Sequence, residues 1–206
     1  MQSYPQLPRG ETVYGPTATI DTNDYVGIDN EGAEAKFPNV DANGVYRSMG
    51  FLYARLMRNV SGVTMYANRL VTHKADYRNR RFDGYARTTA CAVAGVIDPR
   101  LPAGGIRNGD ACWVFFKGPV QVYTGLALAA NLAAGDLAYA ITADNSTGHT
   151  GGGKIEGWPL DLAFTATETT DGTMGKVLAN NIGVLMEAAT SGGETNTLKY
   201  VDLKIR

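Results

Sequence analysis

Apolar and polar residues alternate along much of the chain from about residue 60 onward. The clearest example is the run 160–164, in which Leu160, Leu162 and Phe164 alternate with Asp161, Ala163 and Thr165. Successive side chains of a strand point to opposite faces, so this period of two predicts a half-buried strand. Other runs with the same period lie at 70–73, 120–123, 137–142, 182–186 and 201–206.

Turn-forming residues separate these runs. They are Gly104-Gly105, Gly118-Pro119, Gly135-Asp136, residues 144–153, Asp171-Gly172 and Ser191-Gly192-Gly193. Many short strands divided by such turns are typical of all-β folds. We therefore expect a mainly β domain over residues 60–206, built as a small β-barrel or a β-sandwich.

The run Ala111–Phe116 has a different pattern, because the residues of both alternating sets are apolar. Cys112, Val114 and Phe116 alternate with Trp113 and Phe115. A strand of this composition is expected to be buried on both faces.

Residues 45–59 contain the best helix candidate. Val45, Met49, Leu52, Tyr53 and Leu56 recur at helical spacing, and Asn59 is a suitable end. Gly50 weakens the pattern, because glycine disfavours a helix interior. We predict one short helix here, whose apolar stripe faces either its own core or a partner.

Residues 1–44 are rich in Pro, Gly, Asp and Asn and contain only short apolar groups. This composition predicts an extended N-terminal arm with one or two weak strands. The arm either reaches a neighbouring subunit or packs on its own domain.

The overall composition fits a globular protein. Of the 206 residues, 44% are hydrophobic and 19% are charged, which suits one domain with an embellishment or two small ones. The net charge of −1 provides no global attraction to nucleic acid or membranes.

The charge is unevenly distributed along the chain. Residues 1–46 carry two basic and seven acidic side chains, residues 47–87 nine and two, and residues 88–206 eight and eleven. A basic middle between acidic flanks suits a surface that meets an acidic partner, and a solvated basic face is the alternative.

Compartment signals are few. Cys91 and Cys112 lie in apolar runs and are expected to be reduced core thiols. The first residues do not have the pattern of a secretory signal, and no apolar stretch approaches the length of a membrane span. We therefore expect synthesis in a cytoplasm and no membrane partner.

The segment Gly148–Lys154 is the nearest approach to an enzyme motif. It matches a phosphate-binding loop as far as the lysine, but Ile155 stands where the loop needs Ser or Thr. Gly157 and Pro159 then oppose the helix that the motif requires. A hairpin loop is the better interpretation.

Other catalytic patterns are also weak. His73 and His149 are the only histidines, and neither has a Cys or His at zinc-site spacing. The carboxylates around Asp21 lack the pattern of a calcium loop. The segment 144–148 could hold an ion, but its Asp and Asn are also ordinary turn formers. We therefore expect no catalytic residue, no cofactor and no metal site.

Arginines and aromatic residues interleave between residues 74 and 82. This composition is typical of protein interfaces, of solvated basic faces and of nucleic-acid surfaces, and we favour a protein interface over direct nucleic-acid contact. The candidate interface residues are Tyr46, Arg47, Arg55, Arg58, Tyr77, Arg78, Arg80 and Arg81.

Three stretches resemble the capsid decoration, or cement, proteins of tailed bacteriophages. They are residues 46–63, with Leu52-Tyr53-Ala54-Arg55-Leu56-Met57-Arg58; residues 83–118, with Asp83-Gly84-Tyr85-Ala86-Arg87 and Trp113–Gly118; and the ending, with Gly135-Asp136, Ile182-Gly183-Val184 and Ser191-Gly192-Gly193-Glu194. Together they cover about two thirds of the chain, and the acidic arm has no counterpart in the family.

The resemblance implies a structural virion protein on the outside of an icosahedral head. Such a protein stabilises the capsid by bridging subunits of the major capsid protein, often as a homotrimer or homodimer, and it has no catalytic residues. The residues also leave open another virion role, such as a head-fibre base, a tail component or a shell subunit. A carbohydrate-binding β-sandwich using Trp113, Trp158 and Tyr123, and a hydrolase on a β scaffold, are further alternatives.

Overall fold

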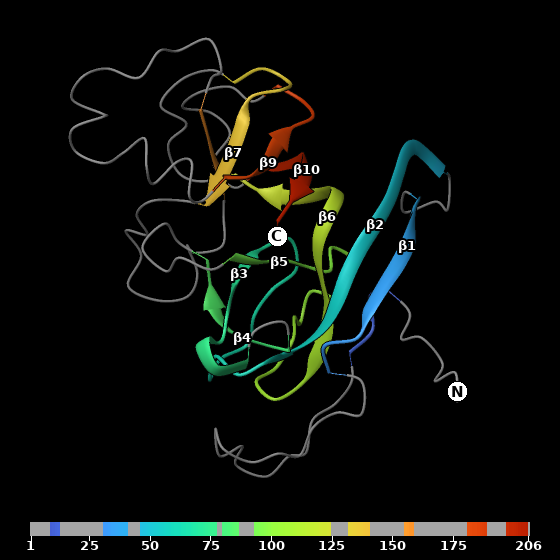
Figure 1. Cartoon of the computed structure of the whole chain (residues 1–206). Helices are drawn as coiled ribbons and strands as arrows, with labels where there is room; N and C mark the ends of the chain where they lie inside the picture. Colours follow the sequence, from blue (N-terminus) through green and yellow to red (C-terminus); the bar gives the residue numbers. More distant parts are fainter. Residues whose placement is uncertain are drawn as a thin grey trace, which may run out of the picture.

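A computed structural model describes residues 9–12, 31–40, 46–77, 80–86, 93–124, 132–140, 155–158, 181–188 and 197–205. Ten strands in this part of the chain form a single sheet, so the expected mainly β architecture is confirmed (Figure 1). The strands are β1 (Glu34–Val40), β2 (Tyr46–Asn59), β3 (Leu70–His73), β4 (Arg81–Tyr85), β5 (Val93–Ile97), β6 (Ala111–Tyr123), β7 (Leu137–Ala140), β8 (Ile155–Trp158), β9 (Asn181–Leu185) and β10 (Leu198–Lys204), and one 3-10 turn, η1, spans Ala75–Tyr77.

The first half of the sheet closes on itself. Its strand order runs β2-β4-β3-β5-β6, and an additional pairing of β2 with β6 completes a ring of these five strands. All pairings in the ring are antiparallel except that of β2 with β4. Closure pairs the strand edges, which would otherwise be open to other chains.

Strand β6 is long enough to continue beyond the ring. Its second half, from Lys117 to Tyr123, pairs with β10, and β9, β7 and β8 follow in that order. A parallel bridge between Thr124 and Ile155 then brings the start of β8 back to the end of β6. Strand β6 therefore joins the two halves of the molecule.

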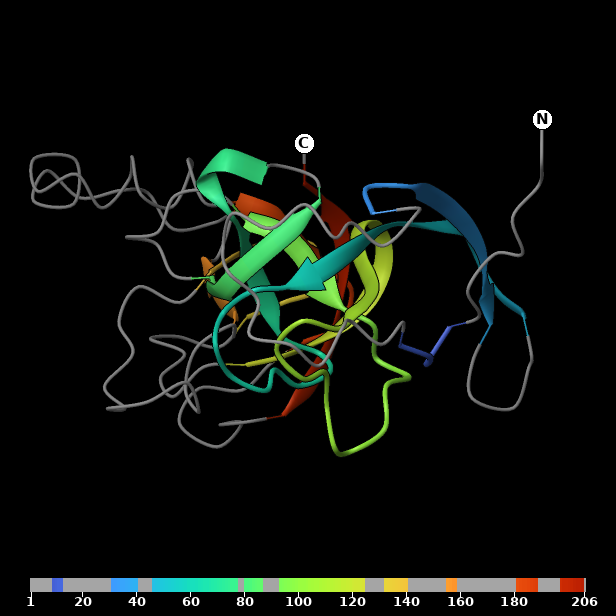
Figure 2. The ribbon, with the colours of Figure 1, turned by 90° about the horizontal axis from the view of Figure 1, so that it is seen from below.

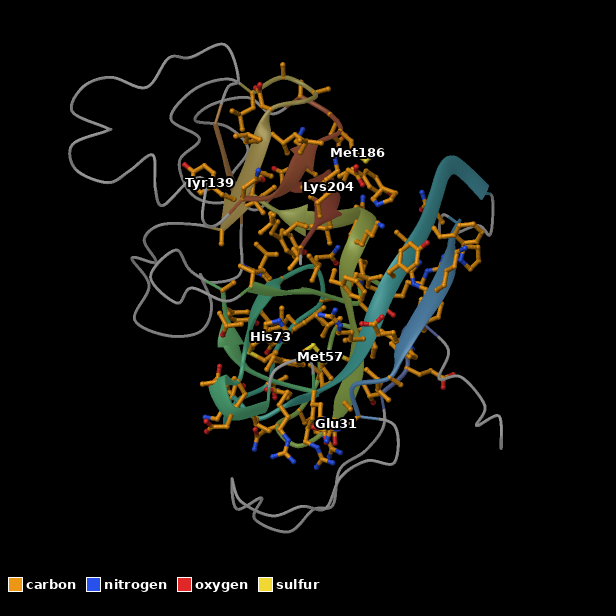
Figure 3. The ribbon with its side chains drawn as sticks, viewed as in Figure 1. Glu31, Met57, His73, Tyr139, Met186 and Lys204 are labelled. Carbon is orange, nitrogen blue, oxygen red and sulfur yellow. The ribbon has the colours of Figure 1, made fainter. Side chains whose placement is uncertain are left out.

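Two hydrophobic cores lie on the two sides of β6. Ala111, Trp113 and Phe115 belong to the larger core, whereas Cys112 and Val114 belong to the smaller one. This observation confirms the predicted burial of both faces. The smaller core fills the ring, where Figure 3 shows Met57, and it also contains Met65, Val71, Phe82, Tyr85, Ala94, Ile97, Leu101 and Ile106.

The predicted helix over residues 45–59 is wrong, because residues 46–59 form the strand β2. Leu52, Ala54 and Leu56 are buried, while Phe51 is exposed and Tyr53 is only partly buried, which is the period of two of a strand. The apolar spacing also fits a helix, but pairing with β1 on one edge and β6 on the other supplies the backbone hydrogen bonds of a strand.

The described parts of the predicted N-terminal arm pack on their own chain. Strand β1 pairs with β2, and Figure 2 shows the two strands as a curved ribbon at one side of the molecule. The backbone N–H of Gly10 donates a 2.7 Å hydrogen bond to Oδ2 of the buried Asp98. The rest of the arm lies outside the described residues.

Strands β3, β7, β9 and β10 confirm the runs that alternate there, and the runs at 111–116 and 120–123 form the single strand β6. The run 160–164, the segment 148–154 and Cys91 lie outside the described part. No helix within the described ranges is long and apolar enough to cross a membrane.

Candidate interaction surface

Over residues 51–55, the face of β2 opposite the larger core carries a charged and aromatic surface. Leu52, Ala54 and Leu56 are buried in the larger core, so Phe51, Tyr53 and Arg55 lie on the opposite face. The side chain of Phe51 retains 49% of its full exposure, which is unusual for so large an apolar group. The neighbouring strands extend this surface on both sides.

Four residues form a row across the sheet, which we call the lysine–tyrosine row. Lys36 of β1 pairs with Tyr53 of β2, Tyr53 pairs with Lys117 of β6, and Lys117 pairs with Lys204 of β10. Directly opposed residues of antiparallel strands have their side chains on the same face. The row therefore carries three lysines and one tyrosine on one face of four strands.

A bulge in β6 sets the register of this row. Ala54 pairs with Phe115, whereas the preceding Tyr53 pairs with Lys117, so Phe116 is an extra residue between them. A bulge redirects the side chains beside it. It leaves Phe116 close to Arg55 and places Lys117 opposite Tyr53.

Two of the three ammonium groups of the row lie near aromatic rings. Nζ of Lys36 lies 3.6 Å from the centroid of the Phe51 ring and 5.9 Å from that of Tyr53. Nζ of Lys117 lies 5.2 Å from the Tyr53 centroid on the other side. Cation–π contacts at exposed sites contribute about 0.5–1 kcal/mol each, so they orient the lysines without neutralising them.

Two carboxylates flank the row, and each is paired with a cation. Nε of Arg55 lies 2.8 Å from Oε1 of Glu34, and its guanidinium carbon lies 4.2 Å from the Phe116 centroid. Nζ of Lys204 lies 3.7 Å from Oδ2 of Asp202. Within the part of the chain that the structure describes, Lys36 and Lys117 have no carboxylate within salt-bridge distance.

The predicted interface arginines have three different environments. Arg55 lies on the surface just described and is partly exposed. Arg58 and Arg81 are instead buried, and their Nε atoms lie 3.7 and 3.0 Å from Oε1 of Glu31. This cluster lies where the end of β2 meets the start of β4, near Glu31 in Figure 3.

The cluster around Glu31 stabilises the interior and is not exposed for a partner. Burial lowers the pKa of Arg58, Glu31 opposes that change, and Arg81 adds to it. Because removing one member of a buried ion cluster leaves an uncompensated charge, the three side chains act as a unit. The two arginines therefore hold β2 and β4 together.

The remaining candidates are less well defined. Arg80 is exposed, and its backbone carbonyl accepts a 2.9 Å hydrogen bond from the N–H of Arg58. The side chains of Tyr46, Arg47 and Tyr77, and the whole of Arg78, lie outside the described residues.

Sequence reasoning missed Lys36, Phe51, Lys117 and Lys204 as surface residues. The period of two in residues 51–56 was an available signal for Phe51, since it places Phe51, Tyr53 and Arg55 on one face. The register that brings Lys36 and Lys117 beside Tyr53 depends on strand pairing and on a bulge, which the sequence does not reveal.

The other candidate chemistry finds little support in the described residues. Trp113 is only 3% exposed and packs edge-on against Phe37, with 5.2 Å between ring centroids, so it cannot stack on a sugar. The described part contains no group of three or more metal-ligating side chains. Burial raises the pKa of Cys112 well above its ordinary value, which disfavours the reactive thiolate.

No protein-family model matches the sequence. A search of the curated proteins also finds no match.

Proposed function

We propose that this chain is a structural virion protein without catalytic activity, which binds the outside of a tailed-phage head. In this role it bridges subunits of the major capsid protein, assembles as a homo-oligomer and stabilises the capsid. The observation that carries the proposal is the surface that the exposed Phe51, Lys36 and Lys117 form with the half-buried Tyr53 and Arg55 on paired strands.

The resemblance to decoration proteins supports the proposal through the place of the stretches that carry it. The stretches 46–63 and 83–118 contain β2 and most of β6, which are neighbours in the sheet. Both strands contribute to the surface, because Tyr53 comes from the first and Lys117 from the second. If this chain and the decoration proteins bind capsids in the same way, the stretches that resemble each other should form one surface, as these two neighbouring strands do.

The composition of the surface is also that of a protein-binding site. Aromatic residues and arginine are enriched in the cores of interfaces, where they act as anchors, and they gain most when a partner removes them from water. Phe51, Tyr53, Phe116 and Arg55 provide such anchors here. The strands beneath them belong to a continuous core, so binding orders few additional groups.

Stabilisation would follow from linkage. A protein that binds the assembled shell more tightly than its free subunits shifts the equilibrium toward the shell. Icosahedral symmetry repeats each contact many times, so a modest contact area per copy is sufficient.

A co-sedimentation experiment tests the proposal. Heads of the phage that carries this chain are prepared without it, expanded, and mixed with the purified protein. We expect saturable binding with a fixed number of copies per head, an oligomer in free solution, and a higher temperature of head disruption. Protein that stays monomeric and remains in the supernatant would overturn the proposal.

A further inference from the structure

Among the residues that the structure describes, no carboxylate matches part of the positive charge of the lysine–tyrosine row. Glu34 is engaged by Arg55 at 2.8 Å and Asp202 by Lys204 at 3.7 Å. Four cations and two carboxylates thus share the surface, and the excess falls on Lys36 and Lys117. Both side chains are exposed, so an incoming anion can reach them without unfolding the sheet.

The pairing of Lys117 with Lys204 adds a repulsion between like charges to this excess of positive charge. The two residues are directly opposite on antiparallel strands, where like charges destabilise a sheet. A carboxylate at either position would remove the repulsion. An external anion above the row would also offset it.

The face of the sheet suits a binding partner better than the edge of β1 does. Strand β1 carries Lys36 and Pro38 at the end of the strand order, and charged side chains and proline hinder the addition of another strand at an edge. The exposed ring of Phe51 and the two ammonium groups all lie on the face.

Carboxylates suit this surface better than a nucleic-acid backbone. Glu34 and Asp202 lie on the same surface and would repel a continuous line of phosphates, and the net charge of −1 does not attract nucleic acid. Lys36 and Lys117 lie on strands separated by β2, which places their backbones about 10 Å apart. Separate carboxylates on a polypeptide can match that spacing individually.

We propose that the lysine–tyrosine row binds an acidic surface segment of the capsid shell subunit, and this inference rests on the function proposed above. Two carboxylates of that segment pair with Lys36 and Lys117, and an apolar side chain covers Phe51. Tyr53 holds the two lysines apart and contacts the segment between them.

Two double variants with the same change in charge test the row. Lys36→Gln/Lys117→Gln removes the two lysines of the row that have no carboxylate partner among the described residues. The control, Lys74→Gln/Lys199→Gln, removes two lysines outside the row. Nζ of Lys74 lies 3.4 Å from Oδ2 of Asp83, and Nζ of Lys199 donates a 2.7 Å hydrogen bond to the carbonyl of Ala188. We expect the first variant to bind expanded heads on the order of tenfold more weakly at low salt and to lose most of the salt dependence. The second should bind like the unaltered chain.

Thermal melting checks that both variants remain folded. Equal binding of heads by the two variants would overturn the role of the row and leave the proposed function standing. Failure of the unaltered chain to bind heads would instead count against the proposed function.

A second measurement tests the row without heads. Hexaglutamate is titrated into the isotope-labelled chain, and the NMR chemical shifts of the backbone amides are followed. We expect the amide shifts around Lys36, Tyr53 and Lys117 to change, and we expect no such change in the Lys36→Gln/Lys117→Gln variant. Absence of those changes, or tighter binding of a thymidine oligonucleotide to the same residues, would contradict the choice of an acidic protein segment.

Discussion

Asp98 shows how one buried carboxylate can fix distant parts of the chain. It is fully buried, and it accepts hydrogen bonds from the N–H of Gly10 at 2.7 Å and the N–H of Arg100 at 3.1 Å. Nη2 of Arg9 lies 3.3 Å from its Oδ1, and the Arg9 guanidinium also lies 4.7 Å from the centroid of the Phe115 ring. Burial lowers the pKa of Arg9, and the charge of Asp98 opposes that change.

We predict that Asp98→Ala lowers the free energy of unfolding by about 3–5 kcal/mol, because it leaves the largely buried Arg9 without its counter-charge. Asp202→Ala is the matched control, since it breaks an exposed 3.7 Å pair with Lys204 and should cost less than about 1 kcal/mol. Urea denaturation of both variants measures the difference. Equal losses would show that Asp98 does not anchor Arg9 in solution.

At the scale of single residues, the sequence predicts environments better than contacts. Cys112 was expected in the core and is fully buried. Arg58 and Arg81 were expected at an interface, yet they surround Glu31 in the interior. The sequence does not reveal this cluster, because it depends on the parallel pairing of the end of β2 with β4.

At the scale of elements, Gly118 lies two residues after the bulged Phe116 of β6 and permits the close approach of β2. Its φ is +99°, and a Cβ atom built there would lie 2.5 Å from the carbonyl oxygen of Phe51. Both features disfavour any other residue, because a positive φ is costly for residues with a Cβ and the obstructing atom belongs to the backbone. The close approach of β2 to β6 therefore requires glycine here.

We predict that Gly118→Ala destabilises the protein by about 1–3 kcal/mol through strain at this position. It should also weaken binding to heads, because the bulge places Lys117 opposite Tyr53. The control Gly84→Ala lies in β4, where a Cβ would meet nothing within 4 Å and the φ is not positive. Thermal melts that rank the two variants equally would refute the argument.

The prediction of elements succeeded where one period dominated the pattern. The alternation at β6 predicted burial of both faces, because both sets of side chains are apolar and each set faces a separate core. It failed at β2, since Leu52 and Leu56 satisfy a helical spacing as well as an alternating one. Burial on one face and strand pairing on both edges decide in favour of the strand, and both are tertiary effects.

At the scale of the whole molecule, β6 makes one structure of two sets of strands. Its first half closes the ring, and its second half carries β10, β9, β7 and β8. The larger core contains residues from both sets, so the surface over β1, β2, β6 and β10 rests on a continuous scaffold. A rigid scaffold favours binding, because little conformational entropy is lost when the partner docks.

The most direct test of the central claim is a cryo-electron microscopy map of the assembled particle. We expect density for this chain on the outer surface of the head, with the face of Lys36, Tyr53 and Lys117 turned toward an acidic segment of the shell subunit. Density for the chain in the tail, in a fibre or in the shell itself, or a row of lysines turned toward solvent, would contradict it.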